Sequence, residues 1–228
     1  NSDQQTTSSR FRSLPVFYLW PLRVATLVLI LLAVNQAFNF NFFIGYTLLS
    51  NKYMYSILII VIPSIFILIP SSISGSKLSV PILDLFLASS SVIILAWFIA
   101  NSFEMMANGW ELAAPKTAQY FSIGLWIIVF EAARRAGGFG LAMIVGIISC
   151  YPIFADIMPG PIRGFSFDVG TAAGYHAMSD ESIIGIPMRA FSNLVIGFLI
   201  FGAALQHTGA GKFFINLAFA LLGHIRGG

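Results

Sequence analysis

Three charged side chains near the end of an apolar run are the residues best placed to do chemistry: Glu131, Arg134 and Arg135. On a helix, Glu131 and Arg134 lie three positions apart, so they share one face and can form an ion pair. Charged groups within an apolar helix can mark an ion path. The interpretation that we favour is an anchor at an interface, held in place by this local ion pair.

Other ionisable residues give weaker signals. Asp84 and Asp156 lie near the ends of apolar runs, and the dipole at a helix N-terminus favours a carboxylate at position 84. Either aspartate could bind a cation, but we expect both at the level of lipid headgroups. His207 and His224 flank the last apolar segment, where helix-end residues are more common than proton relays. The single cysteine, Cys150, excludes an intramolecular disulfide and a cysteine-only zinc site.

The longest polar stretch, residues 159–185, contains Asp168, His176, Asp180 and Glu181. One histidine among carboxylates, without the spacing of metal ligands, does not predict a metal site. Two interpretations remain open for this stretch: an ordered connector, and a docking surface for an external protein. The sequence has no nucleophile elbow, zinc-protease motif or phosphate-binding glycine loop, so it predicts no enzyme and no catalytic residue.

Composition shows which elements must position these residues. Of the 228 residues, 57% are hydrophobic and only 9% are charged, and the mean hydropathy is +0.86. Soluble proteins carry about 25% charged residues. The chain therefore lacks the polar surface of a soluble enzyme, a disordered tail or a nucleic-acid-binding module. The sequence predicts an all-α polytopic membrane protein.

A membrane-spanning helix needs about 20 apolar residues, and the chain has six candidate runs. After a polar N-terminal tail, residues 1–15, these runs are residues 16–38, 53–70, 82–101, 120–133, 139–158 and 186–205. Arg134-Arg135 followed by Gly137-Gly138 separates the fourth run from the fifth. The apolar part of residues 209–226 is too short to span, so we expect an amphipathic or re-entrant segment.

The positive-inside rule predicts the orientation of these spans. With the N-terminus inside, six alternating spans place most of the basic residues on the inner side: Arg10, Arg12, Lys77, Arg134, Arg135, Lys212 and Arg226. The outer side then receives a mixed set: Lys52, Lys116, Arg163, Glu104, Glu111, Asp168, Asp180 and Glu181. We therefore expect a cytoplasmic N-terminus.

Residues 180–228 resemble the start of the large membrane subunit of the tripartite ATP-independent periplasmic (TRAP) transporters. The matching pieces are Gly185-Ile186-Pro187, Phe201-Gly202-Ala203, Thr208-Gly209-Ala210-Gly211, Phe213-Phe214, and Leu222-Gly223 leading to Arg226-Gly227-Gly228. The run Glu131-Ala-Ala-Arg-Arg135 and residues 151–160 resemble the fused permeases, which are associated with binding proteins of the TAXI type. Met188-Arg189 after Pro187 departs from the family pattern and places a cation at the start of a span.

The resemblance implies a sodium-coupled importer of small organic solutes, often carboxylates, in a bacterial or archaeal cytoplasmic membrane. Residues 16–136 would form a small-subunit-like domain of four helices, and residues 137–228 the start of the large subunit. The implied partners are membrane lipid, a periplasmic solute-binding protein and the rest of the large subunit, without nucleic acid.

We expect the chain to be mainly scaffold and a piece of a longer polypeptide, with the sodium ligands beyond Gly228. No cofactor, metal or substrate ligand is assigned to it. The alternative is a membrane scaffold or assembly subunit that takes no part in transport.

Overall fold

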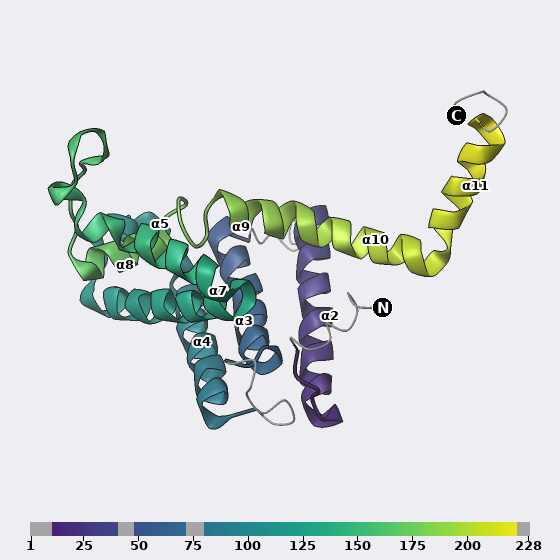
Figure 1. The fold of residues 1–228 in the computed structure, drawn as a ribbon, viewed down its shortest axis with the longest axis horizontal. Helices are drawn as coiled ribbons and strands as arrows, with labels where there is room; N and C mark the ends of the chain where they lie inside the picture. The colour runs from purple at the N-terminus through teal and green to yellow at the C-terminus, as the bar shows by residue number, and fades with distance from the viewer. Residues whose placement is uncertain (1–10, 41–47, 72–79, 223–228) are drawn as a thin grey trace.

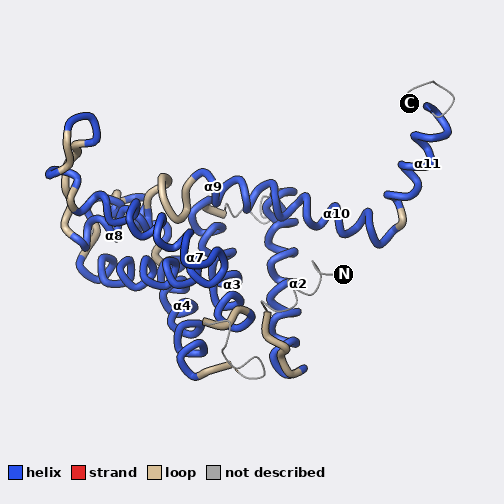
Figure 2. Tube along the Cα trace, in the orientation of Figure 1, coloured by secondary structure: helices blue, strands red, loops and turns tan. Residues whose placement is uncertain are grey.

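The computed structural model describes residues 11–40, 48–71 and 80–222. These residues form helices and turns without a β-strand (Figure 2). Five of the described helices are long and apolar enough to cross a membrane. They are Val16–Phe38 (α2), Ser50–Leu68 (α3), Ile82–Ala100 (α4), Lys116–Ile153 (mostly α7) and Ile186–Thr208. The prediction of an all-α polytopic membrane protein is confirmed.

Prolines set the start of three long helices. Pro15, Pro81 and Pro115 stand immediately before α2, α4 and α7 (Lys116–Cys150). A proline has a fixed φ and no backbone N–H, so it is tolerated where a helix begins and disrupts hydrogen bonding inside one. The exceptions inside helices are Pro21, in the second turn of α2, and the buried Pro63 of α3. Local sequence therefore fixes where these helices begin.

Gly138 divides α7 into two arms that fold back on each other. Its backbone has φ 83° and ψ 179°, a conformation that essentially only glycine adopts. Beyond this turn the chain runs back along the first arm. The two arms approach closely, since a Cβ added to Gly146 would lie 3.0 Å from the ring of Phe130. The expected break between the fourth and fifth apolar runs is confirmed.

The second arm is shorter than the sequence predicts. The fifth apolar run covers residues 139–158, but its α-helix ends at Cys150 and 3-10 turns follow. Pro152 explains this end, since it cannot donate the next helical hydrogen bond and its ring clashes with the preceding turn. Residues 139–150 are about 18 Å long as a helix, so this arm does not by itself cross an apolar layer about 30 Å thick.

One hydrophobic core joins the N-terminal and C-terminal parts of the chain. The Tyr55 hydroxyl donates to the carbonyl oxygen of Ala177 at 2.8 Å, and the Tyr53 hydroxyl donates to that of Ser192 at 2.9 Å. These bonds link α3 to α8 (Val169–Met178) and to a π-helical turn, Phe191–Val195. Tyr55 lies in a core that includes Phe66, Leu95, Phe98, Leu125 and Ile184, and Tyr53 lies in a smaller cluster with Ala33, Ile57 and Ile196. Residues 16–136 and 137–228, which the sequence separates into two regions, thus share one core.

The remaining helices lie around this core. Short helices α5 (Ser102–Ala107) and α6 (Trp110–Ala113) connect α4 to α7. In Figure 1, α2, α3 and α4 run vertically, whereas α7 runs across the view. Helix α9 (Ile186–Ala190) and the π-helical turn lead into α10 (Ile196–Thr208), which contacts α2 and then leaves the core. The predicted amphipathic segment forms α11 (Ala210–Leu222), and its last residues lie outside the described part of the chain.

Gly138→Ala is expected to destabilise the protein by about 1–3 kcal/mol, because alanine is strained at this φ and ψ. Gly140→Ala is the matched control. It lies two positions on, outside the positive-φ region, and a Cβ added there would meet no other group within 4 Å. Alanine favours a helix over glycine by about 0.5–1 kcal/mol, so this control should be neutral or stabilising. Unfolding by SDS titration in mixed micelles measures both variants, and equal effects would contradict the role of Gly138.

Candidate functional site

The carboxylate of Asp84, in the first turn of α4, is buried between two arginines. Arg135 donates from Nη2 to Asp84 Oδ1 at 2.7 Å, and Arg12 donates from Nη2 to Oδ2. The side chains of Arg12 and Arg135 are 1% and 0% exposed, and that of Asp84 is 2% exposed. Charges removed from water in this way are stable only when they are paired, and here each oxygen of Asp84 has its own arginine.

Glu131 extends this pair into a longer network. Arg135 donates from Nε to Glu131 Oε1 at 2.7 Å, and Arg134 binds both oxygens of Glu131 at 2.7 and 2.8 Å. Two planar hydrogen bonds to one carboxylate are among the stronger ion-pair geometries. We call Arg12, Asp84, Glu131, Arg134 and Arg135 the charge network. Its formal charge is positive, with three guanidinium groups and two carboxylates.

The same arginines complete the hydrogen bonds at the end of α3. The last carbonyl groups of a helix lack partners within it and carry a partial negative charge. Arg12 donates from Nη1 to Phe66 O at 3.0 Å and to Ile67 O at 3.1 Å. Arg135 donates to Ile69 O at 3.3 Å, and its guanidinium carbon lies 5.0 Å from the centre of the Phe66 ring. The charge network thus joins the chain before α2, the end of α3, the start of α4 and the first arm of α7.

This geometry decides what the network can do. Both oxygens of Asp84 accept from arginine, so they do not present an open cation site. The network ties four segments of the chain together, and it contains the expected ion pair between Glu131 and Arg134. The position of Glu131, Arg134 and Arg135 at a membrane interface stays a prediction. Sequence reasoning missed Arg12, which was assigned to a polar tail but is only 6% exposed. The available signal was Asp84, because a carboxylate in an apolar helix requires a cationic partner.

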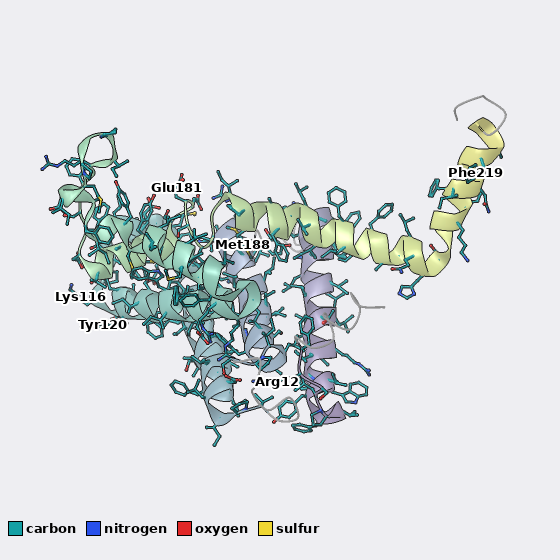
Figure 3. All side chains as sticks on the ribbon, in the orientation of Figure 1. Arg12, Lys116, Tyr120, Glu181, Met188 and Phe219 are labelled. Atoms are coloured by element: carbon teal, nitrogen blue, oxygen red, sulfur yellow. The ribbon has the colours of Figure 1, made fainter. Side chains whose placement is uncertain are left out.

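Charged residues collect at the two ends of α3. The charge network surrounds its C-terminal end, whereas Glu111, Asp180 and Arg189 line a cavity of about 240 Å³ beside Ser50 at its N-terminal end. Figure 3 shows Arg12 and Glu181 near opposite ends of the helical bundle. Arg12, Arg134 and Arg135, which the sequence assigns to the inner side, thus lie at one end of α3. Glu111 and Asp180, which it assigns to the outer side, lie at the other end.

Asp168 caps the N-terminus of α8. Its carboxylate accepts hydrogen bonds from the Thr171 hydroxyl at 2.6 Å, from Gly170 N at 3.0 Å and from Thr171 N at 3.2 Å. These bonds, above all that of the Thr171 hydroxyl, lower the pKa of Asp168 below its usual value of 3.8. The cap therefore contributes its full stability at pH values above 3.8, the usual pKa of the group. That contribution is lost as the pH falls through the lowered pKa of the folded protein.

His176 is buried inside the stretch that the sequence left open for docking. Its Nε2 donates to Ser149 O at 2.7 Å, since a carbonyl can only accept, and Nδ1 lies 2.9 Å from Ser182 Oγ. The Trp126 ring centre is 5.1 Å away. His176 consequently ties α8 to both arms of α7 and does not present its side chain to a partner in this conformation.

Asp180 and Glu181 are exposed acidic neighbours in this stretch. Asp180 forms an ion pair with Arg189 of α9, which explains how a cation is accommodated at the start of that span. The carboxylate of Glu181 forms no ion pair with the part of the chain that the structure describes. Of the four residues assigned to a docking loop, Asp180 and Glu181 lie together on the surface, while Asp168 is an exposed cap.

The glycines and other motif residues near the C-terminus have different structural roles. A Cβ on Gly185 would lie 2.9 Å from Ser182 O, so a side chain does not fit there. Pro187 lies in the first turn of α9, and Gly209, with φ 73°, separates α10 from α11. Phe201 is exposed, and open space surrounds the Cβ positions of Gly202 and Gly211. Gly227 and Gly228 lie outside the described residues.

Comparison with known families gives one match. Residues 125–228 match the family model of the DctM component of tripartite ATP-independent periplasmic transporters. The match covers slightly less than half of the chain and begins within the first arm of α7. No curated protein and no solved structure matched the chain. Within the described residues, no group of three or more His, Cys, Asp or Glu side chains could hold a metal ion.

Asp84→Ala is expected to destabilise the protein by about 3–5 kcal/mol, because it leaves two buried arginines without their carboxylate. Glu104→Ala, at an exposed carboxylate of α5, is the control and should change stability by no more than about 0.5 kcal/mol. The free energy of unfolding in mixed micelles gives both values. The double variant Arg12→Met, Asp84→Ala should lose less unfolding free energy than the sum of the losses in the two single variants. Losses that simply add would argue against the network.

Proposed function

We propose that this chain is the scaffold part of a TRAP-transporter permease. The observation that carries the proposal is the match of residues 125–228 to the DctM component. Five apolar helices of spanning length support it, because a permease must cross the membrane repeatedly. The alternative of a scaffold outside any transport system is less well supported, since the matched family is a transporter component.

The packing supports a stationary role for these residues. The charge network joins α3, α4 and α7 to the segment before α2, and the shared core joins them to α8. Separating these elements would expose buried charges and apolar side chains, so we propose that they remain together during transport. We assign the moving domain and the sodium and solute ligands to the rest of the large subunit. In this proposal, residues 16–136 correspond to the small subunit and residues 137–228 to the start of the large one.

We further propose that the transporter imports small organic solutes, mainly carboxylates, with sodium and a TAXI-type periplasmic binding protein. The charge network then lies at the cytoplasmic side of the inner membrane of a bacterium or archaeon. Its three arginines support this orientation through the positive-inside rule. The exposed Asp180 and Glu181 would then face the binding protein.

Uptake by the complete permease in proteoliposomes tests this function. Solute accumulation is expected only with an inward sodium gradient and the solute-loaded binding protein outside. Replacing sodium with potassium, or omitting the binding protein, should each abolish accumulation. Accumulation that persisted in either case would refute the sodium coupling or the binding-protein dependence, respectively.

Glu181→Lys is expected to weaken docking of the binding protein, because it reverses an exposed charge that has no ion pair within the described residues. The concentration of binding protein that gives half-maximal uptake should rise several-fold, with a stronger effect at low salt and an unchanged maximal rate. Asp156→Lys, the same type of charge reversal at another exposed carboxylate, is the control. An equal shift in both variants would contradict a specific docking role for Glu181.

A further inference from the structure

An apolar groove runs between α2 and α3. It encloses about 500 Å³, which is within the range of small-molecule binding sites. Its walls are mainly aliphatic, and include Leu22, Leu29, Ile60, Val61, Ile65 and Leu68. A groove of this chemistry on a membrane-spanning helix pair suits a hydrocarbon chain.

One cation lines this apolar groove. Arg23 is an exposed residue of α2, and its guanidinium carbon lies 5.9 Å from the centre of the Trp20 ring. Unlike Arg12 and Arg135, it forms no ion pair with the described residues. A cation on the lipid-facing surface of a helix is costly unless it reaches water or an anion. The groove therefore combines an apolar wall with a cation that lacks an anion within the described part of the chain.

The groove runs along the two helices, as a bound acyl chain would. One end is lined by Phe11 and Ile69, next to the charge network. The other end reaches Leu29 and Ile60, about 12 Å along α3 from its last residue, Leu68, by helical rise. Trp20 is 61% exposed, and tryptophans commonly mark the level of the membrane interface. The polar end of an occupant would thus lie near Arg23, with its apolar end between the helices.

We infer that this groove binds an anionic phospholipid, with an acyl chain between α2 and α3 and the phosphate on Arg23. The argument rests on charge complementarity, because the positive charge network and Arg23 lie at the same end of the helix pair. Basic pockets between membrane helices on the cytoplasmic side bind anionic headgroups by this principle. The inference does not depend on the proposed transport activity.

Titration of the purified, delipidated full chain with phospholipid tests the site. Phosphatidylglycerol and phosphatidylcholine with the same brominated acyl chains are added in micelles, and quenching of Trp20 fluorescence is followed. A Trp20→Phe variant gives the signal of the other tryptophans, which is subtracted. Phosphatidylglycerol should bind about fivefold more tightly than phosphatidylcholine, the preference expected for one cation near the membrane surface.

Variants identify the source of this preference. Arg23→Gln should abolish it, whereas Arg23→Lys should retain it. Arg163→Gln, the same change at an exposed arginine in the turn after Ile162, should leave it intact. Ala25→Phe, which fills the groove, should weaken the binding of both lipids.

Three results would overturn the inference. The first is equal binding of the two lipids to the unmodified chain, and the second is a preference that survives in Arg23→Gln. The third is self-association that shields Trp20 from both lipids, which would show that a second copy covers the groove.

Discussion

The burial of one carboxylate, Asp84, between Arg12 and Arg135 joins α3, α4, α7 and the segment before α2 at one end of the bundle. Neither arginine could remain buried without an anion, and Asp84 could not remain charged without them. Both arginines also donate to carbonyl groups at the end of α3, where the last carbonyls of a helix lack partners within it. A single charge requirement therefore fixes the relative positions of four segments that are distant in the sequence.

A different kind of bond holds the opposite end of the bundle. Tyr53, Tyr55 and His176 each donate to a backbone carbonyl of another element. These donors are buried, and a buried polar group without a partner is destabilising. The bonds therefore hold the joined helices in fixed positions relative to one another. Between the two ends lies an apolar core shared by both parts of the chain. This construction suits a rigid scaffold, and it leaves α10 and α11 extending away from the core (Figure 1).

Features that depend on neighbouring residues were predictable from the sequence. Apolar runs located the long helices, because about 20 apolar residues are needed to cross a bilayer. Gly137-Gly138 marked the turn in α7, since glycine adopts the backbone conformation found at Gly138. The run of residues 139–158 was misleading, because hydropathy continues past Cys150 while Pro152 ends the helix. Hydropathy reports the environment that residues prefer, and it does not report whether their backbone stays helical.

The sequence by itself determined the class of this protein, its helical segments and the resemblance of its C-terminal part to a transporter subunit. These properties follow from composition, local backbone preferences and short motifs. Only the tertiary structure decided that Arg12 is buried, that Asp84 is paired twice and that His176 lies inside the bundle. Arg12 and Asp84 are 72 positions apart, and Arg135 and Asp84 are 51 apart. Such pairs form because folding removes several charges from water at the same place, and periodicity along the chain contains no record of which charges will meet.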